Sequence, residues 1–266
     1  MSALHFTIID FADASLNKTS VLVTGERDAI VIDAAFTRAD GHRIVAAVLD
    51  SGKTLRTVAI TAGDPDFYFG AEVIQDAFPD ARFVAPADVI EHIAHSYEKK
   101  LGAWAHLGPN LPTRLVDIDV LDGDLTLESH TLELRKADAL GDRGWYFFEP
   151  ETRSVVGGVL LFDGLHVWTA DSATSDSRAA WLEALDSLDA LDPQFVAAGH
   201  RAPGAPTDAT AIAHTRAYLQ LFEQIVADSS SAESAEKALL AAYPEAGLTI
   251  AAGLGTKVAK GEMTWG

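Results

Sequence analysis

The alternation of apolar runs between residues 29 and 100 constrains the fold of this chain more than any other feature. Short runs typical of strands alternate with amphipathic runs typical of helices, in the order 29–32, 38–50, 57–61, 69–77, 81–85 and 87–100. Strands and helices that alternate in this way build layered α/β folds. We therefore predict a sheet covered by helices in this part of the chain.

The middle of the chain has a different pattern. Short strand-like runs follow one another directly, at 115–120, 125–129, 131–135, 144–148 and 154–157. Consecutive strands joined by short turns pair antiparallel, which predicts a meander. Helix and strand patterns then alternate again, at 177–188, 194–198, 209–227 and 232–242. We predict one domain, residues 1–266, with two sheets flanked by helices.

Composition excludes several classes of function. The chain has 266 residues, 39 acidic and 20 basic side chains, nine histidines and no cysteine. The absence of cysteine excludes disulfides, thiolate metal sites and a cysteine nucleophile. The net charge of −19 argues against nucleic acid and anionic membranes as partners. We see no signal-peptide pattern and no apolar run of roughly 20 residues, so we expect a soluble, cytoplasmic protein.

One segment concentrates the side chains that indicate chemistry. The apolar run 58–61 is followed by Asp64-Pro65-Asp66 and then by a helical pattern. In open α/β layers, ligands bind where strands end. Pro65 stiffens the turn, so Asp64 and Asp66 are able to converge on one site, but aspartate is also a common helix N-cap. Spacing alone leaves both interpretations open.

With these residues the chain resembles the metallo-β-lactamase superfamily. That family carries Thr-His-x-His-x-Asp-His, followed shortly by Gly, after the same strand. The matching residues, in the order of the family, are 29–34, Thr61, Asp66, Gly70, 154–158 and 195–200. The resemblance implies an α/β fold of a particular type, the four-layer αββα sandwich.

The departures from the family pattern fall on its metal ligands. The positions where the family has a ligand and this chain does not keep it are occupied by Ala62, Asp64, Phe67 and Gly158. A further histidine is expected near residue 140, where the local side chains include Asp138 and Asp142. The family's ligand is kept at Asp66 and at His200.

These substitutions limit the metals that the site is able to hold. Two zinc ions need more ligands than remain, so we do not expect a dinuclear centre. A single divalent ion such as zinc is conceivable, held by Asp64, Asp66 and His200. Without an ion, the gathered carboxylates repel, which raises the pKa of at least one and makes it a candidate acid or base. Both states, one metal ion or none, stay open.

Neighbouring side chains are candidates for substrate binding. Phe67 and Tyr68 follow the two aspartates, and Asp142 lies where the family places a ligand. His166 follows the strand of Gly158 at a point where hydrolases of this fold place a polar loop above the site. Aromatic side chains at such positions often serve packing alone.

The resemblance leaves two functions open, because a fold does not fix an activity. The first is hydrolysis of a small ester or lactone, with water activated by one metal ion or directly by Asp64, Asp66 or His200. The second is a non-catalytic role in which the cleft binds a small molecule. A small-molecule ligand is expected in both cases, and a homodimer is a candidate assembly.

Overall fold

Successive apolar side chains of the first strands point to opposite faces of the first sheet, and both faces are covered by other elements. In a computed structural model, which describes residues 3–265, Ile30 and Ile32 face the second sheet while Val31 faces helices. The strands lie in chain order: β1 His5–Asp10, β2 Thr19–Thr24, β3 Asp28–Ile32, β4 Thr54–Ala59, β5 Arg82–Ala85 and β6 Asp119–Val120.

The predicted meander forms most of the second sheet, in the order β12-β10-β9-β8-β7. Its strands are β7 Leu125–Leu127, β8 His130–Lys136, β9 Trp145–Glu149, β10 Ser154–Val156 and β12 Phe195–Ala197. The pairs from β7 to β10 are antiparallel as predicted, and β12 joins β10 in parallel. The expectation for 115–120 was wrong, because its strand, β6, pairs in parallel with β5 in the first sheet.

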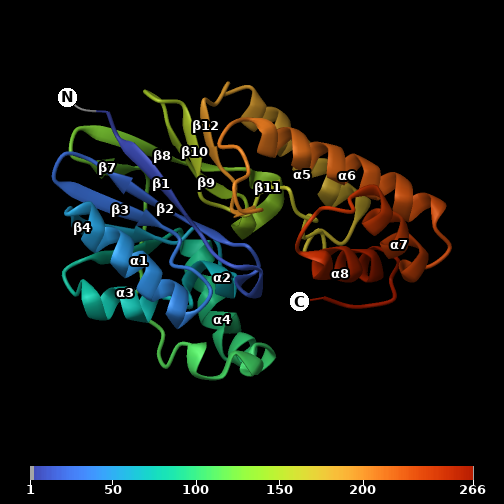
Figure 1. The fold of residues 1–266 in the computed structure, drawn as a ribbon, viewed down its shortest axis with the longest axis horizontal. Helices are drawn as coiled ribbons and strands as arrows, with labels where there is room; N and C mark the ends of the chain where they lie inside the picture. The colour runs from blue at the N-terminus through green and yellow to red at the C-terminus, as the bar shows by residue number, and fades with distance from the viewer. Residues whose placement is uncertain (1–2, 266) are drawn as a thin grey trace.

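Helices cover the outer faces of both sheets and complete the four-layer αββα sandwich (Figure 1). On the first sheet lie α1 (Arg38–Ser51) and α3 (Ala71–Ala77), and beside the second lie α5 (Ser175–Asp189) and α6 (Thr210–Asp228). The chain ends in α7 (Ala232–Ala242) and α8 (Thr249–Ala259), which pack together beside α6. No helix among residues 3–265 is long and apolar enough to cross a membrane.

The segment after β4 folds differently from the single helix predicted for 69–77. It forms two helices, α2 (Pro65–Tyr68) and α3, with Gly70 between them. A β-carbon on Gly70 would lie 2.2 Å from the carbonyl oxygen of Ala34, so only glycine allows this close approach. The contact fixes α2, and hence Asp66, against the end of β3.

Further elements complete the edge of the sandwich where β4 and β10 end. They are η1 Asp13–Ser15, α4 Ala87–Ala103, η2 Ala105–Asn110, η3 Asp138–Arg143, β11 Phe162–Asp163 and β13 His200–Arg201. Strands β11 and β13 pair in parallel and bring residue 200 beside residue 162. This edge therefore gathers segments from every quarter of the chain.

Candidate functional site

Asp66 and His200 meet at this edge although they are far apart in sequence. Asp66 lies in α2 and His200 begins β13, and the carboxylate oxygen Oδ2 is 3.3 Å from the imidazole Nε2. Both side chains are buried. The ring of Phe162 stacks on His200, with centroids 4.8 Å apart and planes 6° apart. The fold thus holds these two predicted site residues in one fixed contact.

The hydrogen bonds of His200 define where its protons lie. Nδ1 is 2.9 Å from the carbonyl oxygen of Leu16, which is only able to accept, so Nδ1 carries a proton. Nε2 then faces the Asp66 carboxylate. Asp66 and His200 therefore form a buried pair whose acidic and basic groups lie directly opposite each other.

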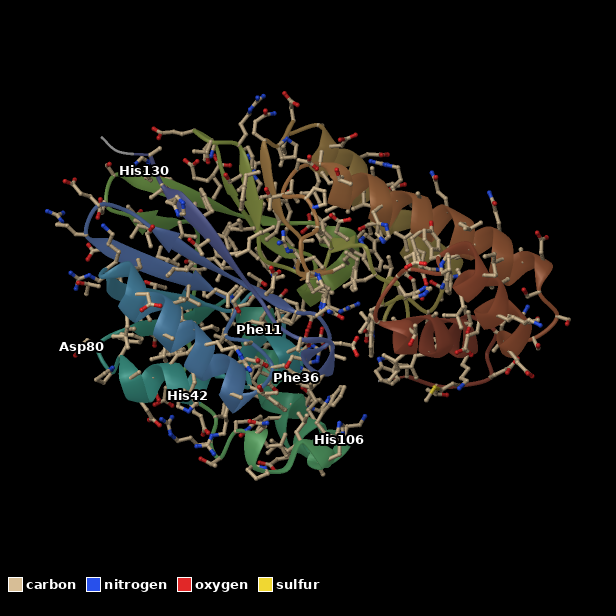
Figure 2. The ribbon with its side chains drawn as sticks, in the orientation of Figure 1. Phe11, Phe36, His42, Asp80, His106 and His130 are labelled. Atoms are coloured by element: carbon tan, nitrogen blue, oxygen red, sulfur yellow. The ribbon has the colours of Figure 1, made fainter. Side chains whose placement is uncertain are left out.

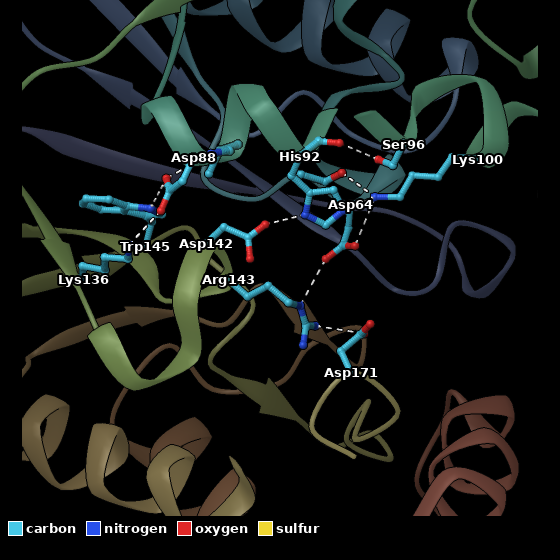
Figure 3. Close-up of polar contacts among 12 residues, drawn as sticks. Asp64, Asp88, His92, Ser96, Lys100, Lys136, Asp142, Arg143, Trp145 and Asp171 are labelled. Carbon is cyan, nitrogen blue, oxygen red and sulfur yellow. Dashed lines mark hydrogen bonds and ion pairs between the residues drawn. The ribbon is translucent and has the colours of Figure 1, made fainter. Parts of the chain in front are cut away.

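Asp64 is held by two cations. Its Oδ2 lies 3.4 Å from Nε of Arg143, and its Oδ1 lies 3.5 Å from Nζ of Lys100 (Figure 3). Burial alone would raise the pKa of Asp64, but the charges of Arg143 and Lys100 outweigh it and lower the pKa below its usual value. Asp64 is therefore a carboxylate with cations on both oxygens.

A polar chain extends from Lys100 along α4. The Lys100 ammonium donates to the carbonyl of Gly63 at 2.6 Å and to Nε2 of His92 at 2.9 Å. Because that nitrogen accepts, Nδ1 of His92 carries the proton and donates it to Asp142, as Figure 3 shows. Asp142, predicted to bind substrate, is thereby fixed by a histidine.

Arg143 connects this network of polar side chains to the loop that carries Asp171. Its Nη2 lies 3.3 Å from Oδ2 of Asp171, whose Oδ1 accepts from the indole of Trp265 at 3.0 Å. Burial raises the pKa of Asp171 although the Arg143 charge lowers it, and the charge of Asp64 adds to the rise. Of the two carboxyl groups beside Arg143, Asp171 therefore has the higher pKa and Asp64 the lower one.

Lys18 supplies a further cation, and it is fully buried. Its ammonium donates to the carbonyl of Thr19 at 2.6 Å, pairs with Asp33 at 3.1 Å, and lies 4.0 Å above the centroid of the Phe67 ring. Asp33 in turn accepts from the backbone and hydroxyl of Thr61. Phe67 thus contacts a lysine ammonium.

The two other predicted substrate contacts lie in different surroundings. Tyr68 is buried near the aspartates, and burial together with Tyr97, Asp64 and Asp66 raises its pKa. His166 is fully buried between Tyr218 and Tyr243, with Nδ1 at 3.1 Å from the Tyr218 hydroxyl. Its described contacts belong to the C-terminal helices, and its predicted role at the Asp66 site stays a prediction.

Ala62 and Gly158, two positions predicted to lack a metal ligand, lie in tightly packed surroundings. Ala62 is fully buried in the core. Gly158 has φ 81°, its N–H donates to the Thr61 hydroxyl at 2.8 Å, and a β-carbon there would lie 2.4 Å from the Trp145 carbonyl oxygen. An aspartate at residue 158 would therefore clash with the backbone of β9.

The three residues predicted as metal ligands already have other partners. Asp64 already binds two side-chain cations, and Asp66 and His200 face each other. Among residues 3–265, the group with three potential ligand atoms within 4.8 Å of one another is a different one: His130, Glu149 and Glu151. The described arrangement of Asp64, Asp66 and His200 does not fit a metal ion, and their role as ligands stays a prediction.

His130 begins β8 and lies at the β7–β8 side of the sheets (Figure 2). His130 contacts Glu151 at 3.1 Å, while both oxygens of Glu149 accept hydrogen bonds from the turn that follows it, at residues 151 and 152. The Glu149 carboxylate therefore stabilises this turn.

Figure 2 also places His42 and His106 on the α-helical side, where both are exposed.

The sequence analysis did not predict the cationic side chains of the site. His92 and Lys100 lie eight residues apart in α4 and on one face of it, a spacing that was visible without the structure. Arg143 follows Asp142 directly. Lys18 and Asp171 lie in segments without any pattern, and only the tertiary fold brings them to the cleft.

Comparisons with known proteins agree with this architecture. A family model described as the metallo-β-lactamase superfamily matches residues 16–200, and the chain belongs to that superfamily. A search of curated proteins finds no match.

Solved structures of low sequence identity share the fold. A metallo-β-lactamase family protein from Thermus thermophilus is 17% identical, with 97% of this chain and 93% of that chain covered and a TM-score of 0.64. A β-lactamase domain protein from Burkholderia ambifaria is 13% identical, with 97% and 84% covered and a TM-score of 0.65. The FIM-1 metallo-β-lactamase of Pseudomonas aeruginosa, in its mono-zinc form, is 15% identical, with 82% and 90% covered and a TM-score of 0.56.

Proposed function

We propose that this chain is a non-catalytic, metal-independent member of its superfamily, whose cleft binds a small carboxylate. The observation that carries the proposal is the pairing of Asp64 with Lys100 and Arg143. Lys100 and Arg143 neutralise the negative charge that Asp64 would otherwise offer to a metal ion. They also give the cleft the groups that recognise a carboxylate, above all the planar guanidinium of Arg143.

Asp171 acts in this proposal as an internal stand-in for the ligand. It reaches Arg143 from a loop at 3.3 Å, longer than the roughly 2.7–2.9 Å of a strong charge-assisted hydrogen bond. The cavity beside Arg143 measures about 10 Å³, close to the space of one water molecule. A ligand carboxylate must therefore displace Asp171 from Arg143.

Isothermal titration calorimetry with hexanoate tests this proposal, with hexan-1-ol as the neutral control. We expect saturable binding of hexanoate, about tenfold tighter in Asp171→Asn because the competing carboxylate is removed, and lost in Arg143→Gln. Arg153→Gln, which removes an exposed arginine elsewhere, is the matched control. Equal binding of the alcohol, or binding that survives Arg143→Gln, would refute the proposal.

A second candidate function is metal-free hydrolysis of a small ester or lactone. The observation that favours it is the 3.3 Å contact between the Asp66 carboxylate and the His200 imidazole, because general acid–base catalysis uses such a pair of groups. A panel of ester and lactone substrates tests it against Asp66→Asn and His200→Gln. Turnover that both substitutions abolish would support hydrolysis and overturn the non-catalytic role.

A further inference from the structure

One corner of the second sheet brings an imidazole and two carboxylates together. β8 begins at His130, β9 ends at Glu149, and Glu151 lies in the turn between β9 and β10. The antiparallel register of β8 and β9 pairs residue 133 with residue 148, so its continuation places residue 130 opposite residue 151. Lys136, at the other end of β8, lies beside the residues of the cleft in Figure 3. The sheet therefore holds this corner apart from the cleft.

The spacing of the three side chains suits a tetrahedral metal ion. Nδ1 of His130 lies 3.1 Å from Oε2 of Glu151, and ligand atoms of all three residues lie within 4.8 Å of one another. Zinc binds imidazole nitrogen and carboxylate oxygen at about 2.0–2.2 Å, so two ligands of a tetrahedral ion lie roughly 3.3–3.5 Å apart. His130 and Glu151 therefore already stand close to the separation of two zinc ligands.

Glu149 is a buried carboxylate without a lysine or arginine partner. The residue is 2% exposed, and the ion pair found at this corner among residues 3–265 joins His130 to Glu151 instead. The oxygens of Glu149 accept from uncharged groups, which are the backbone N–H of Glu151 and the backbone N–H and hydroxyl of Thr152. Buried charges in proteins are generally paired with a counter-ion or bound to a metal. Glu149 thus places a negative charge here that a cation would neutralise.

The turn that holds Glu149 leaves it able to bind a metal. Its Oε1 accepts one hydrogen bond, from the N–H of Glu151 at 3.1 Å, and a carboxylate oxygen has two lone pairs. Its Oε2 is oriented by Thr152, whose hydroxyl is also 2.7 Å from that of Ser154. Hydrogen bonds of this kind fix the orientation of a metal ligand. The side chain of Glu151 is 67% exposed, so an ion is able to enter from solvent.

We propose that His130, Glu149 and Glu151 bind one zinc ion, with water as the fourth ligand. Nδ1 of the neutral His130 ring supplies the nitrogen ligand, which favours zinc over magnesium. The two carboxylates supply the two negative charges that neutralise a divalent ion. The ion joins the start of β8 to the turn between β9 and β10. The site has a structural role, and the proposed carboxylate binding in the cleft does not depend on it.

Calorimetric titration of metal-free protein with zinc chloride tests this site, and magnesium chloride is the comparison. We expect one equivalent of zinc to bind, no saturable binding of magnesium, and a melting temperature that rises with zinc because the ion binds the folded corner. The zinc affinity should fall at least about tenfold in Glu151→Gln and in His130→Gln. His106→Gln and Glu183→Gln, which change exposed residues elsewhere, are the matched controls and should leave the affinity unchanged.

Three results would overturn the site: no zinc bound by wild type, equal affinity in Glu151→Gln and wild type, or losses in the controls as large as in His130→Gln. Zinc bound by wild type and lost in Asp66→Ala would also overturn it, because the ion would then lie in the cleft. Glu151 is exposed, so its variant should fold even if His130→Gln does not. A failure of hexanoate to bind the cleft would leave the zinc result untouched.

Discussion

At the scale of single residues, the cleft depends on buried charges that satisfy one another. Lys18 and Asp33 are both fully buried, and each is the other's counter-ion. Removing one partner of such a pair leaves an uncompensated charge in a medium of low polarity. The charges of the site therefore carry stability as well as any binding role.

Replacing Lys18 by Met should lower the free energy of unfolding by about 3–5 kcal/mol, because Asp33 then loses its cation. The pair of Arg56 and Asp28 has the same chemistry at the surface, and Arg56→Met should cost less than about 1 kcal/mol. Urea denaturation followed by circular dichroism measures both. Similar losses for the two variants would mean that burial does not strengthen the Lys18 pair.

Asp64→Asn should reduce stability in a pH-dependent way. The pKa of Asp64 is lowered in the folded protein, so its charged form is favoured by folding. Its contribution is present above the unfolded pKa of 3.8 and is lost as the pH falls through the lower folded value. The stability gap between wild type and Asp64→Asn should therefore be widest near neutral pH and close below about pH 4.

Denaturant titrations at several pH values measure this gap. Asp119→Asn is the control, since Asp119 forms an exposed ion pair with Arg82 at 3.5 Å. Its effect should be small at every pH, because exposed pairs contribute little. A gap for Asp64→Asn that stays constant down to the lowest pH would contradict the pairing of Asp64 with cations.

At the scale of elements, glycines decide how closely the strands of the site approach. Gly158 joins the end of β10 to the backbone of β9, and Gly70 brings α2 against residue 34. At residue 158 the backbone accepts glycine, because a β-carbon there would lie 2.4 Å from the Trp145 carbonyl oxygen.

Gly158→Ala should destabilise the protein by about 1–3 kcal/mol more than Gly123→Ala. Both glycines have positive φ, 81° and 101°, but a β-carbon on Gly123 would meet nothing within 4 Å. The difference between the variants therefore isolates the clash with Trp145. Thermal unfolding measures it, and equal melting temperatures would show that the backbone relaxes around the new side chain.

The elements also show what the sequence was able to predict. Strongly periodic helices such as 38–50 and 232–242 were found within one residue of α1 and α7. Helix α8 was missed because Gly253 and Gly255 weaken a helical pattern, and it forms because that face packs against other helices. The strand at 119–120 was assigned to the wrong sheet, since pairing of short strands depends on tertiary contacts.

The candidate site was predictable only in part, for a similar reason. Asp64, Asp66 and Phe67 were predicted as site residues because they share one short segment with a family pattern. Their partners come from distant segments, and no local signal marks Lys18 or Asp171. A family motif is a local property of a sequence, whereas the cations that surround Asp64 are brought there by the whole fold.

At the scale of the whole molecule, the two sheets share one apolar core, built from side chains of both. The predicted single domain should therefore unfold in one cooperative transition. Guanidinium curves from circular dichroism and from tryptophan fluorescence should coincide, since tryptophans lie in both halves of the chain. Two separate transitions would indicate that the C-terminal helices form an independent unit.

The central claim is that side-chain cations, rather than a metal ion, neutralise the cleft. Its most direct test is the zinc content of protein saturated with zinc and then dialysed without chelator, measured for wild type, Asp66→Ala and His200→Ala. We predict no retained zinc that depends on Asp66 or His200, so the three proteins should hold equal amounts. One equivalent of zinc in wild type, lost in both variants, would contradict the claim.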